Sequence, residues 1–207
     1  MRRLPVYLIA DTSGSMSGEP IQQAWRLFGD IISLLRQDPF SLETAIVSVI
    51  TYSKFVEMTP FCGIDTFVMP ELPIISSGPK NCGLALERLL DSYQKDIRET
   101  SIKQKGDWRS IVILATIGSP SDVRDYSNAV KKLKALNKHS IFVFHGNEKK
   151  TDSYKSLAEE IFPLYSYDLY SLKKIFGYTW MEDTIEVDSI SISSELPPPP
   201  SEVNIII

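Results

Sequence analysis

Three oxygen-bearing side chains, spaced two residues apart, follow an apolar run near the start of the sequence. Asp11, Ser13 and Ser15 come directly after residues 5–10, which are typical of a buried strand. One carboxylate and two hydroxyls are hard oxygen ligands of the kind that Mg²⁺ or Mn²⁺ prefers. Asp and Ser are also favoured where a helix begins, so a purely structural cap is the alternative interpretation. The sequence therefore predicts either a cation site or a helix cap in this loop.

The elements that would position this loop alternate between strands and helices along the chain. Apolar runs predict strands over residues 5–10, 42–52, 55–61, 111–115, 141–144 and 164–167. Apolar residues at helical spacing predict helices over residues 19–38, 83–97, 126–136, 154–162 and 172–176. This alternation predicts an α/β fold with a doubly wound, parallel sheet and helices on both faces. Ligands of such sheets bind at the carboxyl ends of the strands, the end called the top face below.

Composition excludes several classes of protein. The 207 residues are 43% hydrophobic and carry a formal net charge of −4 with both signs interspersed, so no basic surface for nucleic acid or acidic membranes is expected. Cys62, Cys82, His139 and His145 show no metal-ligand spacing. The first predicted strand begins almost at Met1, which leaves no room for a signal peptide, and no apolar run is long enough to span a bilayer. We therefore expect a cytoplasmic protein.

The last part of the chain differs from the rest, so we expect a domain over residues 1–180 and a tail over residues 181–207. Polar and apolar residues alternate from residue 185 to 193, four prolines follow at residues 197–200, and the chain closes on three isoleucines. A disordered terminus is one interpretation of this pattern. A strand or tail that docks on a partner is the other.

Three separated stretches, in this order, resemble the TerY-like bacterial von Willebrand factor type A (VWA) proteins. They are residues 1–8, the loop Asp-Thr-Ser-Gly-Ser-Met-Ser-Gly-Glu-Pro at residues 11–20, and Lys-Gly-Asp-Trp at residues 105–108. The resemblance covers about residues 1–180. It implies a Rossmann-like, six-stranded sheet with one antiparallel edge strand. It also implies a metal-ion-dependent adhesion site, to which Asp11, Ser13 and Ser15 would contribute.

The resemblance also implies a biological role. VWA domains of this kind use the metal to bind an acidic group of a partner and perform no chemistry of their own. TerY-like proteins are associated with tellurite-resistance and stress operons. Some are found beside a serine/threonine protein kinase and a metal-dependent protein phosphatase. An adaptor role in phosphorylation signalling is therefore expected, with protein partners and neither nucleic acid nor membrane.

The second and third loops depart from the family pattern. Lys80 stands where the second loop usually supplies Thr, and Ile117 follows Thr116 where the third loop usually supplies its Asp. Asp122 corresponds to the family's outer acidic position, which does not face the metal. The formal charge of the site thus changes from about −2 to about zero. A divalent ion about 4 Å from Lys80 would face roughly 8 kcal/mol of repulsion at an effective dielectric of about 20. We expect no cofactor, or at most weak Mg²⁺ or Mn²⁺.

Lys80 allows two interpretations. Its ammonium either pairs with Asp11 in the position of the lost metal, with Ser13 and Ser15 accepting hydrogen bonds, or points into solvent. The residues predicted to form the partner-binding top face are Asp11, Ser13, Ser15, Lys80, Thr116 and Ile117.

Three functions remain open. The first is a non-enzymatic protein–protein interaction module without metal. The second is a metal-dependent ligand binder in which Thr116 or Ser119 replaces a missing oxygen. The third, an Asp11-dependent phosphohydrolase, has the least support because Ile117 removes the second carboxylate that its chemistry needs. His145, at a predicted strand end, is better explained as an ordinary loop histidine than as a catalytic one.

Overall fold

The fold is built around the strand β1 (Leu4–Asp11), all of whose residues are buried. The computed structural model describes residues 2–75, 77–102 and 104–176. Successive side chains of β1 point to opposite faces of the sheet, so Val6 and Leu8 join one hydrophobic cluster and Tyr7 and Ile9 join the other. A strand buried on both faces must be almost wholly apolar, and this is why the apolar run at residues 5–10 identifies it.

The remaining elements follow in the order that an alternating α/β chain predicts. The helices are α1 (Glu19–Gln37), α2 (Pro39–Thr44), α3 (Cys82–Asp96) and α4 (Val123–Leu136), with 3₁₀ turns η1 (Gly14–Met16), η2 (Glu148–Lys150) and η3 (Asp152–Tyr154). The other strands are β2 (Ala45–Tyr52), β3 (Val56–Met58), β4 (Cys62–Gly63), β5 (Ser110–Thr116), β6 (His139–His145) and β7 (Glu160–Pro163). Residues 169–176 are also helical.

The strands form one mixed sheet in the order β3-β2-β1-β5-β6-β7, with β4 also paired to β2. The neighbours β2, β1, β5, β6 and β7 are parallel, whereas β3 and β4 run antiparallel to β2. The predicted α/β fold with an antiparallel edge strand is therefore confirmed. The described sheet has seven strands instead of the expected six, because the two-residue strand β4 was not predicted.

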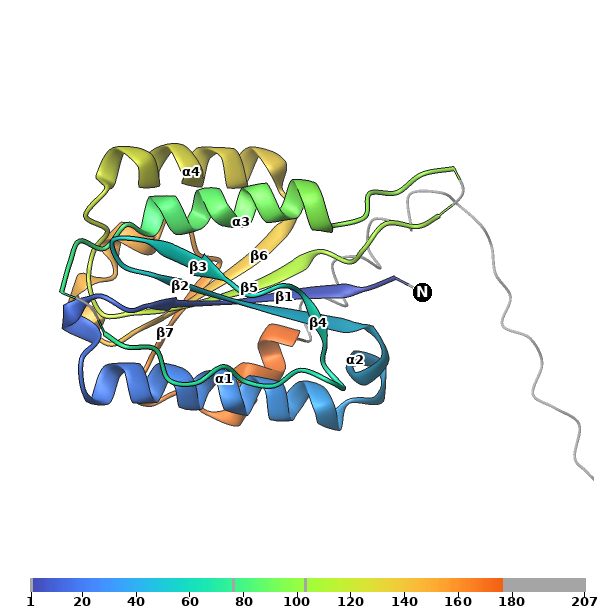
Figure 1. The fold of residues 1–207 in the computed structure, drawn as a ribbon, viewed down its shortest axis with the longest axis horizontal. Coiled ribbons are helices and arrows are strands. Elements are labelled where there is room, and N and C mark those ends of the chain that lie inside the picture. Colours follow the sequence, from blue (N-terminus) through green and yellow to red (C-terminus); the bar gives the residue numbers. More distant parts are fainter. Residues whose placement is uncertain (1, 76, 103, 177–207) are drawn as a thin grey trace, which may run out of the picture.

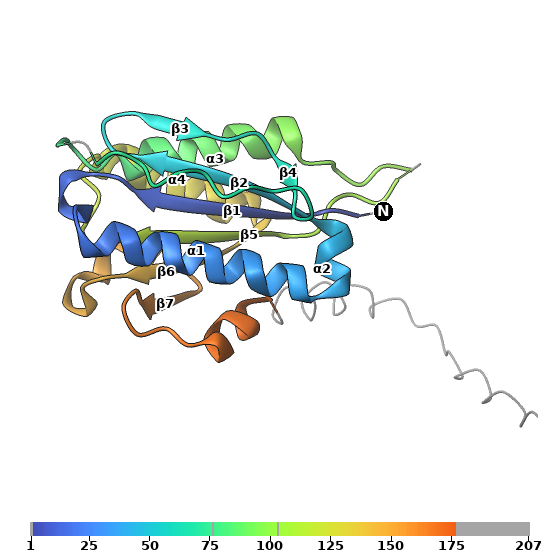
Figure 2. The same ribbon diagram turned by 60° about the horizontal axis from the view of Figure 1, so that its bottom comes forward.

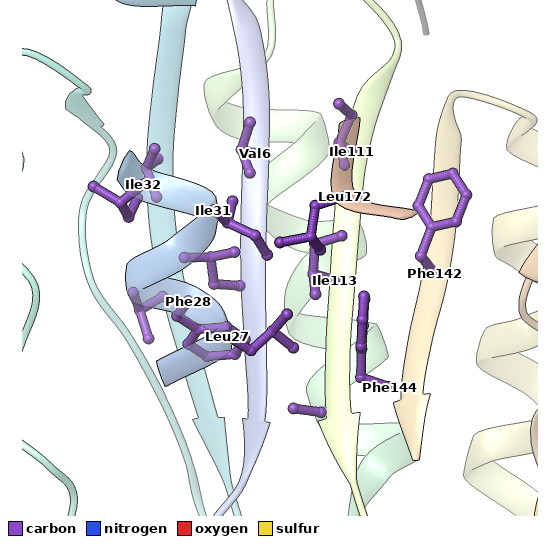
Figure 3. Packing of buried hydrophobic residues seen from close by; sticks show 14 of the residues in the cluster. Val6, Leu27, Phe28, Ile31, Ile32, Ile111, Ile113, Phe142, Phe144 and Leu172 are labelled. Atoms are coloured by element: carbon purple, nitrogen blue, oxygen red, sulfur yellow. The ribbon is translucent and has the colours of Figure 1, made fainter. Parts of the chain in front are cut away.

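Helices cover both faces of the sheet, as Figures 1 and 2 show. On one face, α1 buries Leu27, Phe28 and Ile31 against Val6 of β1 (Figure 3). Leu172, from helical residues 169–176, belongs to the same cluster. On the other face, α3 and α4 lie side by side and pack on the opposite side of the same strands. The loops at the top face, into which β1 and β5 lead, are thereby held on a rigid scaffold.

Three predicted elements differ from the structure. Residues 42–44 belong to helix α2 and not to a strand, since Pro39 opens that helix and the Asp38 carboxylate accepts the Ser41 N–H at its first turn. The helix predicted at residues 154–162 is wrong, because only Tyr154 is in a 3₁₀ turn and β7 begins at Glu160. The strand predicted at residues 164–167 instead lies four residues earlier, as β7. The helix predicted at residues 172–176 is confirmed within 169–176.

The predicted tail at residues 181–207 lies outside the described residues. Within the described ranges, no helix has both the length and the apolar character that crossing a membrane requires.

Candidate functional site

Asp11, the last residue of β1, is fully buried at the carboxyl end of the sheet. Its neighbours are the central strands β2 and β5, which bring Tyr52 and Thr116 to the same level. One carboxylate oxygen, Oδ1, accepts the Ser13 backbone N–H at 2.8 Å. The other, Oδ2, accepts the Thr116 hydroxyl at 2.9 Å. The predicted neighbours Asp11 and Thr116, 105 residues apart in sequence, are thus in direct contact.

Ser13 and Ser15 lie in the turn that follows Asp11. Ser13 is buried, whereas Ser15 is exposed in the 3₁₀ turn η1. Their hydroxyl oxygens are 3.1 Å apart and form a hydrogen bond with each other. The turn is closed by the Met16 N–H, which donates to the Ser13 carbonyl at 2.8 Å. No side-chain cap was found at Ser13, so the interpretation of this loop as a helix cap is wrong there.

Lys80 points inward and not into solvent. Its Nζ lies 3.5 Å from Oδ2 of Asp11, and its side chain is only 15% exposed against 0% for Asp11. At this distance the two groups form an ion pair, but they are too far apart for a strong hydrogen bond. Of the two interpretations of Lys80, the structure has the pairing with Asp11. The serine part of that interpretation differs, because within the described residues Ser13 and Ser15 bond to each other and neither accepts from Lys80.

Backbone hydrogen bonds fix the direction of Lys80. Its N–H donates to the Ser121 hydroxyl at 3.0 Å, and its carbonyl accepts the Ser121 N–H at 2.9 Å. The next residue, Asn81, donates its N–H to Ser53 at 3.1 Å. The second loop is therefore tied both to the third loop and to the turn after β2. From this backbone, the Lys80 side chain passes Gly118 of the third loop and reaches Asp11.

Gly118 makes room for the Lys80 side chain. A Cβ atom at residue 118 would lie 2.1 Å from the Lys80 Nζ and 3.2 Å from its Cε. Any larger residue at this position would push the ammonium away from Asp11. Lys80 and Gly118 thus form one fitted pair across two loops.

Ile117 and Asp122 have no direct part in the ion pair. The Ile117 side chain lies against Gly146: a Cβ atom added to Gly146 would be 2.3 Å from the Ile117 Cγ2. Ile117 also packs against the hydrophobic cluster that α1 covers. Asp122 Oδ2 accepts the Leu84 N–H at 3.1 Å and so joins the start of α3 to the start of α4. Ile117 is therefore near the site without contributing a polar group, and Asp122 has a structural role.

The titratable side chains near Asp11, other than Lys80, are neutral. Burial raises the pKa of Tyr52, of Tyr154 and of the Cys82 thiol, so all three stay protonated at neutral pH. Burial lowers the pKa of His145, whose Nδ1 accepts the Asn147 N–H at 3.0 Å. The imidazole is therefore neutral and carries its proton on Nε2. Because these side chains are buried and uncharged, the local dielectric is low, and the attraction between Asp11 and Lys80 is stronger than it would be in water.

These surroundings offer little for covalent chemistry. A buried thiol with a raised pKa, such as Cys82, is a poor nucleophile. His145, the last residue of β6, accepts a backbone N–H through Nδ1, whereas its Nε2 is buried without a hydrogen-bond partner among the described residues. Its interpretation as an ordinary loop histidine stays a prediction. The oxygens that a cation could use in these loops are the Asp11 carboxylate and the hydroxyls of Ser13, Ser15 and Thr116. Within the described ranges, no three His, Cys, Asp or Glu side chains gather in a group that could hold a metal ion.

Sequence reasoning missed three residues that build the site. Gly118 accommodates Lys80, Ser121 fixes its backbone, and Tyr154 donates its hydroxyl to the Gly118 carbonyl at 2.8 Å. The pattern Gly-Ser-Pro-Ser at residues 118–121 was visible as a loop. That the glycine and the second serine serve Lys80 becomes apparent only when the two loops are placed together.

Comparisons with solved structures support the fold. A von Willebrand factor type A protein from Catenulispora acidiphila is similar with a TM-score of 0.58 at 14% identity, over 86% of this chain and 42% of that one. The pilus adhesin SpaC from Lactobacillus rhamnosus GG is similar with a TM-score of 0.62 at 10% identity, over 90% and 30%. The PilB minor pilin from Streptococcus sanguinis is similar with a TM-score of 0.58 at 13% identity, over 91% and 62%. The chain thus spans less than two thirds of each of these proteins.

Sequence comparison gives the family. Curated proteins provide no significant match. The profile of the von Willebrand factor type A domain matches residues 6–176, which include all three loops of the site and nearly the whole described sheet. Domains of this family are typically non-catalytic modules for interaction or adhesion. With this match and the strand order described above, the chain belongs to the von Willebrand factor type A domain family.

Proposed function

We propose that this VWA domain is a protein–protein interaction module that recognises its partner through the top face without a metal ion. The observation that carries the proposal is the position of the Lys80 ammonium, 3.5 Å from the Asp11 carboxylate. Family membership supports the interaction role. The ion pair supports its independence from metal.

The donor set at Asp11 does not fit a divalent cation. Oδ2 of Asp11 already accepts from Thr116 and faces Lys80, and Oδ1 accepts from Ser13. With one carboxylate and one ammonium, the site has a formal charge of zero. A divalent ion beside Lys80 would meet roughly 8 kcal/mol of repulsion at about 4 Å and an effective dielectric of about 20. Neutral hydroxyls offer too little to offset that cost, so this is a degenerate metal-ion-dependent adhesion site.

Exposed aromatic side chains beside the site could anchor a partner. Phe55, in the turn after β2, is 71% exposed, and Tyr165, whose ring lies beside Gly146 after β6, is 45% exposed. Both follow strands that end at the top face, so they lie on either side of Asp11. Aromatic side chains are frequent hot spots of protein interfaces because they bury a large area with few rotatable bonds.

The biological setting of the proposal rests on the resemblance to TerY-like proteins. We place the module in the cytoplasm, as an adaptor in a tellurite-resistance or stress system. Its expected partners are a serine/threonine protein kinase and a metal-dependent protein phosphatase. Neither nucleic acid nor a membrane is expected as a partner.

The proposal is tested by a pull-down from the host's lysate on the immobilised chain, with and without EDTA. A metal-free interface keeps its partners in EDTA, whereas a metal-bridged complex dissolves. Phe55→Ala should reduce partner retention at least tenfold, because it removes an exposed anchor beside the site. Tyr170→Ala is the matched control, since Tyr170 is 76% exposed but lies in helical residues 169–176, away from the top face.

Charge reversal gives a second arm. Lys80→Glu would remove the counter-charge of Asp11 and place a second carboxylate beside it, so it should cost at least about 3 kcal/mol. Lys131→Glu reverses an exposed lysine of α4 and should leave binding unchanged. Equal retention by the parent chain, Phe55→Ala and Lys80→Glu would show that the top face is not used. Loss of all partners in EDTA would support the metal-dependent alternative instead.

A further inference from the structure

A charged cleft of about 660 Å³ lies at the end of the sheet opposite the top face. It is lined by four basic residues, Arg2, Arg98, Arg109 and Lys138, and by two acidic ones, Glu99 and Asp107. These residues precede β1, β5 and β6 or follow α3, which places them at the amino ends of the parallel strands. We call it the basal cleft.

Hydrogen bonds to Asp107 connect two segments of the basal cleft, the residues before β1 and those after α3. The Asp107 carboxylate accepts from the Arg3 guanidinium, from the Arg3 backbone N–H at 3.2 Å and from the Arg98 N–H at 2.9 Å. Burial alone would raise the pKa of Asp107, but these hydrogen bonds outweigh it and lower that pKa. Because Arg3 neutralises Asp107, the cleft keeps an excess of positive charge. Asp107 belongs to the Lys-Gly-Asp-Trp motif at residues 105–108, so this motif helps to form the cleft.

Charge is divided unevenly along the chain. Residues 1–176 contain all 22 Lys and Arg side chains and 20 of the 26 Asp and Glu side chains, for a formal charge of +2. Residues 177–207 contain six acidic side chains and no basic one. Four of these acids fall within seven residues, at 182, 183, 186 and 188. The net charge of −4 therefore conceals a nearly neutral body and an acidic segment of opposite sign to the basal cleft.

The described chain ends on the same side of the molecule as the basal cleft. Phe176 is buried and shares a groove with Pro39, which follows the last turn of α1. The neighbouring Phe40 contacts the Trp108 ring, with the two centroids 6.3 Å apart. Trp108 lines the basal cleft, and the Arg2 guanidinium lies 3.6 Å from the centre of its ring. A continuous surface thus leads from the end of the described chain to the cleft.

The connection from Phe176 to the acidic segment can extend over tens of ångströms. The acid at position 182 is six residues beyond Phe176, and that at position 188 is twelve residues beyond it. At about 3.3 Å for each extended residue, these positions reach roughly 20 and 40 Å from Phe176. A short tether also raises the effective concentration of the segment at the cleft to about the millimolar range.

We propose that the acidic segment at residues 182–188 binds, within the same molecule, in the basal cleft between Arg98 and Lys138. The binding is electrostatic, so it weakens steeply with salt. It occupies the end of the domain opposite the top face and leaves the top face open to a partner. The inference does not depend on the proposed function, because it concerns other residues.

Carbodiimide cross-linking of the full chain tests this proposal, since the reagent joins a lysine amine directly to a carboxylate in contact with it. At low micromolar protein, peptides that join Lys138 to residues 182–188 should appear in the monomer fraction. They should be at least tenfold more abundant than peptides that join Lys131 to that segment. Lys131 is the matched control because it is exposed on α4, the helix that ends just before Lys138, but lines a separate groove with Leu84. The Lys138 cross-links should fall at least tenfold in 1 M NaCl.

A charge reversal distinguishes specific binding from general attraction. Arg98→Glu should reduce the Lys138 cross-links at least tenfold, whereas Arg124→Glu, at an exposed arginine in the first turn of α4, should leave them unchanged. The proposal is overturned if Lys131 and Lys138 cross-link equally to the segment. It is also overturned if the cross-links occur only in a dimer fraction, which would assign the segment to a second copy. Cross-links unaffected by both salt and Arg98→Glu would contradict it as well.

Discussion

At the scale of single residues, Asp11 is a carboxylate that needs a cation. It is fully buried, and its two hydrogen bonds, from Ser13 and Thr116, do not neutralise its charge. A buried charge without a counter-charge costs several kcal/mol in the interior of a protein. A divalent ion would supply this charge in a complete metal site. Here the Lys80 ammonium supplies it from within the chain.

Lys80→Met is expected to destabilise the fold by about 3–5 kcal/mol at pH 7, because it leaves the Asp11 charge buried and unpaired. Urea unfolding followed by circular dichroism measures the change. Lys131→Met, at an exposed position, should change the free energy of unfolding by no more than about 0.5 kcal/mol. Adding Asp11→Asn to Lys80→Met should recover part of the loss, since no charge is then left unpaired. A double variant less stable than Lys80→Met would contradict the role assigned to the pair.

The direction of Lys80 shows where sequence reasoning ends at this scale. The sequence placed Lys80 beside Asp11 in the family frame and left two directions open, because a lysine side chain is long and flexible. The structure selects one direction through contacts that are remote in sequence. Ser121 fixes the backbone, and Gly118 leaves the space that the ammonium crosses.

At the scale of elements, long periodic segments were predictable and short ones were not. The strand β5 was predicted because a central parallel strand must be apolar on both faces. The segment from Tyr154 to Phe162 has apolar residues at helical spacing. Its last residues, from Glu160 on, nevertheless pair with the edge of β6 and form β7. The Glu159 N–H already donates to Ile141 of β6 at 2.8 Å. Pairing with a sheet edge is a long-range effect that local periodicity does not report.

Two helical glycines, one at a close contact between helices and one in open space, allow the packing of α3 on α4 to be tested. At Gly83, a Cβ would lie 2.3 Å from the Tyr126 backbone N, so α3 and α4 would have to separate. At Gly29, in α1, a Cβ would meet nothing within 4 Å. Gly83→Ala should therefore destabilise the fold by about 2–3 kcal/mol, whereas Gly29→Ala should stabilise it by about 0.5–1 kcal/mol.

Thermal unfolding of both glycine variants and the parent chain provides the measurement. The chemical change is the same in the two variants, so helix propensity alone predicts stabilisation in both. A stabilising Gly83→Ala would show that α3 and α4 are not in close contact at this point.

At the scale of the whole molecule, stability should depend on pH through a residue far from the top face. His139 begins β6 and is 5% exposed, and within the described residues neither ring nitrogen has a hydrogen-bond partner. Burial, and secondarily the charge of Arg109, lower the pKa of His139 to about 4. The unfolded chain binds this proton near the ordinary value of about 6.5. Protonation therefore favours unfolding, and stability is lost as the pH falls from about 6.5 towards 4.

The parent chain should lose about 2 kcal/mol more than His139→Phe when the pH falls from 7 to 5, since the two pKa values differ by about 2.5. Urea unfolding of both proteins at each pH measures this difference. Carboxylates and the other histidine change the stability of both proteins alike, so the comparison isolates His139. Parallel stability profiles for the two proteins would contradict a depressed pKa at this site.

The central claim, that Lys80 takes the place of a metal at Asp11, is tested most directly by isothermal titration calorimetry with Mn²⁺ and Mg²⁺. We predict no binding tighter than the millimolar range for the parent chain. The variant Lys80→Thr with Ile117→Asp, which removes the ammonium and returns the second carboxylate, should bind Mn²⁺ at least tenfold more tightly than the parent. A one-to-one isotherm with a micromolar Kd for the parent chain would contradict the claim.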